Sequence, residues 1–321
     1  ERIRSPVRNH AHPEPTPTMM FELWIPITIA AAFFQNLRSA LQKHLKGRLS
    51  TSGASYVRFF YALPLAVLYV WGLNAWGGVD LPTPNPAFFI YCVLGGVSQI
   101  LFTVVLLWTF NFRNFAVGTT FSKLEVVMVA VLGAVVLGDR LNWIAIIAIA
   151  VSACGLIALS LGQAKLSVRA LIAGLGEKAT LFGLVAAAFL GASSVFYRGG
   201  SLALGHDSVV MSAAFTLAVS LSIQTLIMGI WIAWREPGEF TRVLANWRTA
   251  GAVGVVGMLG SVGWFTAFTI QDAAHVRALG QIELVFTFIA TTFFFHEKVD
   301  AREAIGIVLV VGGIILLVLG G

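Results

Sequence analysis

Seven ionisable side chains lie inside long apolar stretches of the sequence, where a charge is costly. They are Arg38, Arg58, Lys123, Glu125, Arg198, Arg277 and Glu283. In a bilayer such a side chain costs about 2.5 to 3.5 kcal/mol on insertion scales, so it marks a candidate binding site or ion pathway. Five of the seven are basic. A cavity lined by all of them would have excess positive charge and would favour a carboxylate, a phosphate or a zwitterion.

Two arginines are spaced so that an anion could bind between them. Gln35, Arg38 and Gln42 recur at helical spacing and form one polar stripe in the first apolar stretch. Tyr197 and Arg198 belong to a similar stripe in the second half of the chain. Because a guanidinium presents a planar fork of donors, we predict that Arg38 and Arg198 bind an anion from two sides. The alternative is that both arginines extend to the nearest membrane interface.

Two glutamates could take part in proton coupling. Lys123 and Glu125 are two residues apart, as are Gln281 and Glu283, and Arg277 lies one turn before Gln281. Residues two apart on a continuous helix point in directions about 200° apart, so only one of each pair should face a cavity. Glu125 or Glu283 could bind the coupling proton, because a low dielectric favours the neutral carboxyl. Alternatively, the glutamates form salt bridges to neighbouring basic residues and connect helices.

Trp108 and Trp264 complete the candidate site, since they lie in equivalent stretches of the two halves and could line a cavity for an amphipathic substrate. The predicted substrate-binding residues are Gln35, Arg38, Gln42, Arg58, Trp108, Tyr197, Arg198 and Trp264. The predicted coupling or charge-pair residues are Lys123, Glu125, Arg277, Gln281 and Glu283. The sequence has no HExxH or GxxxxGK[ST] motif, so we predict no catalytic residues, no metal and no cofactor.

The composition requires a bilayer as solvent. Hydrophobic residues make up 58% of the chain and charged residues 11%, whereas about a quarter of a soluble domain is charged. The apolar stretches reach the length of about 20 residues that crosses the hydrocarbon layer. The net charge of +6 comes mostly from basic residues in short loops, which is typical of membrane proteins and predicts no nucleic-acid partner.

Ten candidate spans follow from the apolar stretches and the breaks between them. They cover 21–43, 54–74, 87–109, 115–137, 142–162, 180–202, 208–234, 249–270, 275–295 and 301–320. Residues 1–20 are polar and rich in proline, and we expect a disordered tail there. The loop 163–179 divides the chain into two halves of five spans, residues 21–162 and 180–321.

The two halves repeat each other. An offset of 158 residues places Glu125 on Glu283 (283 − 125 = 158). The same offset pairs Asp139-Arg140 with Glu297-Lys298, and Cys154-Gly155 with Gly312-Gly313. Since each half has an odd number of spans, the second copy should enter the membrane inverted relative to the first.

With these paired glutamates, acidic–basic pairs and small-residue spans, the chain resembles the EamA-type transporters of the drug/metabolite transporter superfamily. The resemblance implies an all-α membrane protein with ten transmembrane helices in two inverted five-helix repeats, a central cavity and alternating access. It also implies termini inside the cytoplasm. The Lys and Arg residues of the loops instead follow mostly the odd-numbered spans, which favours termini outside.

We therefore expect a secondary transporter of a small metabolite, such as an amino acid or organic acid, with proton-coupled export as one option. Alternatives are efflux of lipophilic cations and a channel or lipid scramblase. An intramembrane enzyme would need a metal or nucleophile constellation, which the sequence does not offer. The expected location is the bacterial inner membrane as a multi-pass monomer or homodimer, with a small-molecule substrate and the lipid bilayer as partners.

Overall fold

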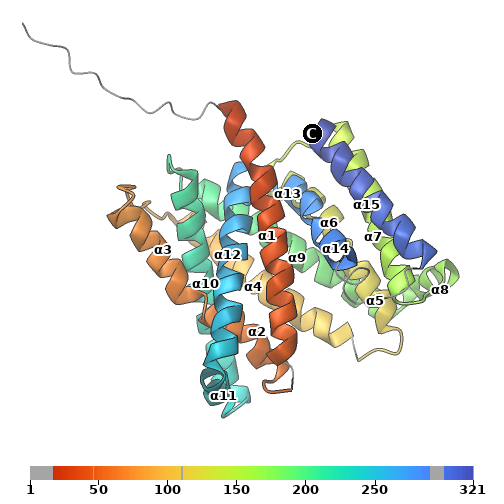
Figure 1. Cartoon of the computed structure of the whole chain (residues 1–321), viewed down its shortest axis with the longest axis horizontal. Helices are drawn as coiled ribbons and strands as arrows, with labels where there is room; N and C mark the ends of the chain where they lie inside the picture. The colour runs from red at the N-terminus through yellow and green to blue at the C-terminus, as the bar shows by residue number, and fades with distance from the viewer. Residues whose placement is uncertain (1–16, 46, 110, 290–299, 321) are drawn as a thin grey trace, which may run out of the picture.

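The computed structural model describes residues 17–45, 47–109, 111–289 and 300–320. These residues are almost entirely helical (Figure 1). Residues 1–16 of the tail predicted at 1–20, and the acidic–basic pair Glu297-Lys298, lie outside the described residues. Residues 17–20 are not disordered as predicted but form the first turn of α1. The first half contains α1 (Pro17–Leu45), α2 (Thr51–Phe60), α3 (Leu63–Ala75), α4 (Pro86–Thr109), α5 (Phe115–Ser122), α6 (Glu125–Leu132), the π-helical segment η1 (Gly133–Leu137) and α7 (Trp143–Gln163).

A short connection of α8 (Val168–Ala173) and the 3-10 segment η2 (Gly174–Gly176) leads to the second half. That half contains α9 (Lys178–Ala203), α10 (Val209–Arg235), α11 (Glu239–Ala245), α12 (Trp247–Ile270), α13 (Ala273–Gly280), α14 (Ile282–Ile289) and α15 (Ala301–Gly320). Within the described residues, seven helices are long and apolar enough to cross a membrane, and the bent pair 115–122 and 125–137 would be an eighth. The multi-span, all-helical prediction is therefore confirmed, while the count of ten stays a prediction.

Local capping explains where several helices begin and end. The side chains of Ser50, Asn142 and Ser208 each accept a hydrogen bond from a backbone N–H three residues later, so α2, α7 and α10 begin there. Gly138 ends η1 with a φ of +73°, a conformation that favours glycine. The chain therefore turns sharply before Asp139.

Two helices are broken at equivalent places in the repeats. The first break, at Lys123 and Leu124, separates α5 from α6 with a bend of 42°. The second break, at Gln281, separates α13 from α14. At both breaks backbone N–H groups bond to carbonyls three residues earlier, as Lys123 does to Thr120 and Gln281 to Ala278. The offset from Lys123 to Gln281 is again 158, so the repeat extends to this irregular feature.

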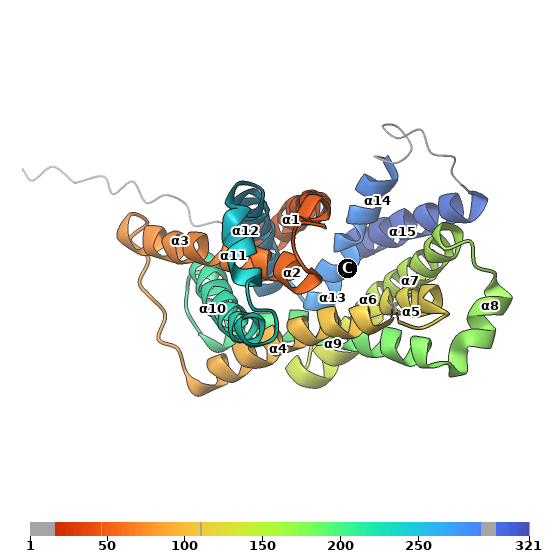
Figure 2. The ribbon, with the colours of Figure 1, turned by 90° about the horizontal axis from the view of Figure 1, so that it is seen from below.

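The helices pack in pairs around the middle of the molecule. α4 lies along α9, α1 lies along α12, and α7 lies along α15 at one edge (Figures 1 and 2). One cluster of buried apolar side chains joins α1, α6, α7, α12, α13 and α15. A second cluster joins α2, α10 and α12. These two clusters lie in different parts of the helical bundle, and the polar groups described below lie on helices that contribute to both.

Small residues allow the close approach of α7 and α15. A Cβ atom at Gly155 would lie 2.8 Å from the carbonyl oxygen of Gly306, and one at Gly313 would overlap Ser152. Gly155 and Gly313 are related by the 158-residue offset, so each repeat contributes the same glycine to the contact. Close contact of small residues is a common basis of helix packing in membranes.

We expect Gly313→Val to destabilise the protein by about 1 to 3 kcal/mol, because the added side chain must push α15 away from Ser152. The neighbouring Gly312→Val is the matched control, since a Cβ atom at Gly312 meets nothing within 4 Å. The measurement is thermal unfolding of the purified variants in detergent. Equal midpoints for the two variants would show that α7 and α15 do not pack through this face.

Candidate functional site

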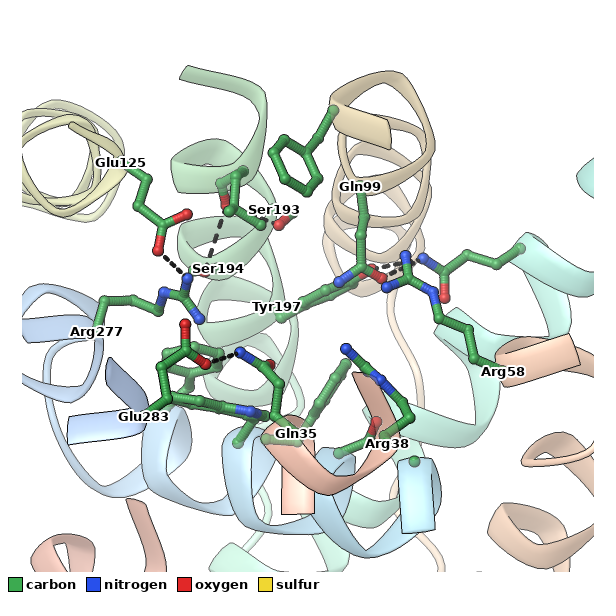
Figure 3. Close-up of a pocket in the computed structure, with 18 of the residues that line it drawn as sticks. Gln35, Arg38, Arg58, Gln99, Glu125, Ser193, Ser194, Tyr197, Arg277 and Glu283 are labelled. Atoms are coloured by element: carbon green, nitrogen blue, oxygen red, sulfur yellow. Dashed lines mark hydrogen bonds and ion pairs between the residues drawn. The ribbon is translucent and has the colours of Figure 1, made fainter. Parts of the chain in front are cut away.

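A cavity of about 390 Å³ lies in the middle of the helical bundle, where helices of both halves meet (Figure 3). Side chains of α1, α2, α4, α5, α6, α9, α10, α12, α13 and α14 line it. Of the thirteen predicted site residues, ten line this cavity: Gln35, Arg38, Arg58, Lys123, Glu125, Tyr197, Trp264, Arg277, Gln281 and Glu283. Gln42, Trp108 and Arg198 do not belong to its lining.

The expectation that only one residue of each charged pair faces the cavity is wrong. Lys123 and Glu125 both line it, and so do Gln281 and Glu283. The expectation assumed continuous helices, but each pair spans a helix break. At the first break the helix bends by 42°, and at the second the helix is interrupted at Gln281, so the spacing of a continuous helix does not apply to either pair.

Glu125 and Arg277 form an ion pair between the two halves. Arg277 Nη2 donates to Glu125 Oε1, and both side chains are almost fully buried. Gln281 Nε2 also donates to this oxygen at 3.4 Å, and the guanidinium of Arg277 lies 5.1 Å from the centre of the Trp264 ring. The pair connects α6 with α13. For Glu125 the structure thus has the arrangement given as the alternative to proton coupling, a salt bridge between helices.

Glu283 has a different environment. Its Oε2 accepts a hydrogen bond from Gln35 Nε2 at 2.6 Å, and its backbone carbonyl accepts one from Asn36. Among the described residues, no basic side chain forms an ion pair with it. The repeat gives the reason: the position equivalent to Arg277 in the first half is Thr119 (277 − 158 = 119), which has no charge.

Arg38 and Arg58 point into the cavity without a carboxylate partner within the described part of the chain (Figure 3). Nε of Arg38 and both Nε and Nη2 of Arg58 are buried without a hydrogen-bond partner there. The Arg58 guanidinium lies 4.4 Å from the centre of the Phe59 ring. The lining contains four basic and two acidic side chains, so its formal charge is +2 (4 − 2 = 2).

Two glutamines beside Arg58 were missed by the sequence analysis. Gln99 Oε1 accepts hydrogen bonds from Gln224 Nε2 at 2.6 Å and from the Tyr197 hydroxyl at 3.2 Å, and Gln224 also donates to that hydroxyl at 3.0 Å. With its oxygen occupied by two donors, Gln99 can direct its amide N–H groups to a ligand. An uncharged amide within an apolar stretch was the signal that could have identified both residues.

The predicted pairing of Arg38 with Arg198 is not found. Nη1 of Arg198 donates to the carbonyl oxygens of Phe268 and Gln271, and its Nη2 lies 2.8 Å from Asp272 Oδ1. Its Nε lies 3.6 Å from Asp139. Tyr197 faces the cavity, and the next residue on a helix points about 100° away from it, toward the loops that follow η1 and α12.

The loop residue Asp139 shares Arg198 with Asp272. Burial raises the pKa of the Asp139 carboxyl, Arg198 opposes that shift, and the neighbouring charge of Asp272 adds to it. Arg198 therefore connects α9 with two loops at one end of the bundle, and it is Arg58 that lies with Arg38 in the cavity.

Gln42 and Trp108 also differ from the prediction. Gln42 Nε2 donates to the carbonyl oxygen of Ala54 and connects α1 with α2 outside the cavity. Trp108 is 54% exposed and packs against Phe182 on the outer surface. Among the described residues, no group of three or more His, Cys, Asp and Glu side chains is arranged to hold a metal ion.

Comparison with known proteins identifies the family. The model of the EamA-like transporter family matches residues 22–161 and 177–319, which are the two repeats. An uncharacterized transporter in the cobO 3' region of Sinorhizobium sp is 24% identical over 134 residues, which are 42% of this chain and 92% of that protein. A crystal structure with 14% sequence identity shares the fold with a TM-score of 0.66, covering 93% of this chain and 97% of the other. The chain is therefore a multi-pass membrane protein that belongs to the EamA-like transporter family.

Proposed function

We propose that this transporter carries a small anionic or zwitterionic metabolite, such as an organic acid or an amino acid, through the central cavity. The observation that supports the proposal is the pair Arg38 and Arg58, which face the cavity without a carboxylate partner among the described residues. An ion buried without a partner is unfavourable, so a site of this kind gains free energy when a ligand supplies the opposite charge. The anion is that ligand.

The geometry around the two arginines suits an acceptor group with several oxygens. Each guanidinium offers parallel N–H donors, and charge-assisted hydrogen bonds of this type are about twice as strong as neutral ones. Gln99 lies beside Arg58 and can supply a further N–H (Figure 3). The formal charge of +2 in the lining disfavours a lipophilic cation, the main alternative substrate.

The proposal includes ten spans in two inverted repeats that alternate between two openings. α1 and the broken helix α13–α14 would be the two further spans beyond the eight long apolar segments. The start of α1 and the end of α15 lie at the same end of the bundle, as an even number of crossings requires (Figure 1). Broken helices that contribute to a site between inverted repeats are typical of secondary transporters. Export across the bacterial inner membrane by a monomer or homodimer is part of this proposal.

We expect Arg38→Gln and Arg58→Gln to abolish anion binding, because each removes a charged donor from the cavity. The measurement is the thermal unfolding of the purified protein with a panel of organic acids, amino acids and lipophilic cations. A ligand at 100 times its dissociation constant adds about 2.7 kcal/mol of stability. Arg48→Gln is the matched control, since Arg48 is exposed in the loop between α1 and α2. Stabilisation of the wild type by cations alone would contradict the proposal.

We also expect the loss of Arg198, which is paired with carboxylates, and the loss of Arg38, which is not, to affect the free energy of unfolding differently. Arg198→Gln leaves Asp139 and Asp272 without their cation and should cost about 3 to 5 kcal/mol. Arg38→Gln removes a charge that has no carboxylate partner in the described residues, so its free energy of unfolding without ligand should be unchanged or higher. Chemical denaturation in detergent measures both variants. A larger loss of stability in Arg38→Gln than in Arg198→Gln would contradict the structural role that we assign to Arg198.

A further inference from the structure

We infer that Glu283, and not Glu125, is the carboxylate that takes up a proton when an anion binds to Arg38 and Arg58. This inference rests on the proposed function. It starts from the difference between two glutamates that occupy equivalent positions in the repeats and line the same cavity. Glu125 forms an ion pair with Arg277, whereas the side-chain partner of Glu283 is the neutral Gln35.

Glu125 forms part of the contact between the two halves. Its carboxylate accepts from Arg277 and from Gln281, and it is buried with both of them. A proton on Glu125 would leave the buried guanidinium of Arg277 without its counter-charge. Removing one partner of a buried ion pair is costly, so Glu125 keeps its negative charge during binding.

Glu283 is free to change its charge. Its one described side-chain partner is Gln35, a neutral donor, and Gln35 lies one turn before Arg38 on α1. The loss of charge on Glu283 therefore breaks no ion pair in the described structure. A protonated carboxyl still has an oxygen that can accept from the Gln35 amide.

The charged groups around Glu283 couple its protonation to the anion. Arg38 faces it from α1 and Arg277 from α13 (Figure 3). Lys123 and Glu125, at the break between α5 and α6, also line the cavity. α15 also packs on α14 but contributes no residue to the lining. In the empty cavity these basic groups face the carboxylate of Glu283 with no other anion between them.

A bound anion changes this balance, because its negative charge offsets that of the arginines and adds repulsion to the carboxylate. Uptake of one proton from water onto a Glu283 oxygen removes that repulsion, and no other bond forms or breaks. By linkage, the proton then strengthens anion binding by the same factor. Anion and proton occupy the cavity together, so the net charge that enters the cavity is less negative by one than the charge of the anion.

The test is isothermal titration calorimetry of the whole purified protein with succinate, L-glutamate and benzoate. The titrations are run in two buffers of different ionisation enthalpy, at a pH where all three probes are fully ionised. The wild type should take up about one proton per bound probe, and its affinity should fall by up to about tenfold per pH unit as the pH rises. Glu283→Gln should bind without proton uptake and with an affinity independent of pH, because the amide resembles the protonated carboxyl.

Two further variants serve as controls. The double variant Glu125→Gln with Arg277→Gln removes a whole ion pair, leaves the net charge unchanged and should keep the proton uptake. Glu283→Asp keeps a carboxylate and should keep it as well. Thermal unfolding of each variant verifies that it is folded before titration.

The outcomes separate this inference from the proposed function. Proton uptake that persists in Glu283→Gln, or a folded Glu283→Gln protein that binds no probe at any pH, overturns the assignment of Glu283. Wild-type binding that depends on Arg38 but takes up no proton overturns the coupling and leaves the anion site intact. If the wild type binds none of the three probes, the anion site itself is wrong, and the inference is overturned with it.

Discussion

The free-energy cost of an unpaired charge in a low-dielectric interior determines how the ionisable side chains at the centre of this protein are arranged. Every ionisable group there must have a partner, face a cavity that a ligand or water can fill, or lose its charge. The protein uses the first solution for Glu125 with Arg277 and for Arg198 with Asp139 and Asp272. Arg38 and Arg58 have no such partner in the described residues but face the cavity, which is why the proposed function assigns substrate binding to them.

The helix breaks decide which side chains share the cavity. The helix is interrupted where α5 meets α6, with a bend of 42°, and again where α13 meets α14, and at both places residues two apart line the same cavity. The breaks also place the Glu125–Arg277 pair between the two halves, so that α6 of one repeat contacts α13 of the other. The close contact of α7 with α15 through equivalent glycines joins the repeats at the edge of the bundle. The site thus lies between two halves that pack on each other throughout the bundle, as α4 does on α9, α1 on α12 and α7 on α15.

The divergence of the two repeats gives the cavity its polarity. A strictly symmetric protein would pair both glutamates or neither, but Thr119 stands where the second half has Arg277. One glutamate is therefore fixed in an ion pair, while the other accepts from neutral Gln35. Gln35 lies between Glu283 and Arg38 in the cavity, and Arg58 lies on the far side of Arg38 (Figure 3). The difference between Thr119 and Arg277 therefore makes the two halves of the cavity unlike in charge.

The sequence alone determined that the protein lies in a bilayer, that it contains a repeat and which charged residues enter the membrane. Hydropathy and a constant offset of 158 residues can both be recognised from the order of residues along the chain. Only the tertiary structure decided which charges meet. Tyr197 and Arg198 are neighbours in sequence, yet one faces the cavity and the other the loops, since the rotation of α9 is set by its packing against α4, α5 and α6. The breaks beside Lys123 and Gln281 were not predicted either, because a run of apolar residues has the same period on both sides of a bend.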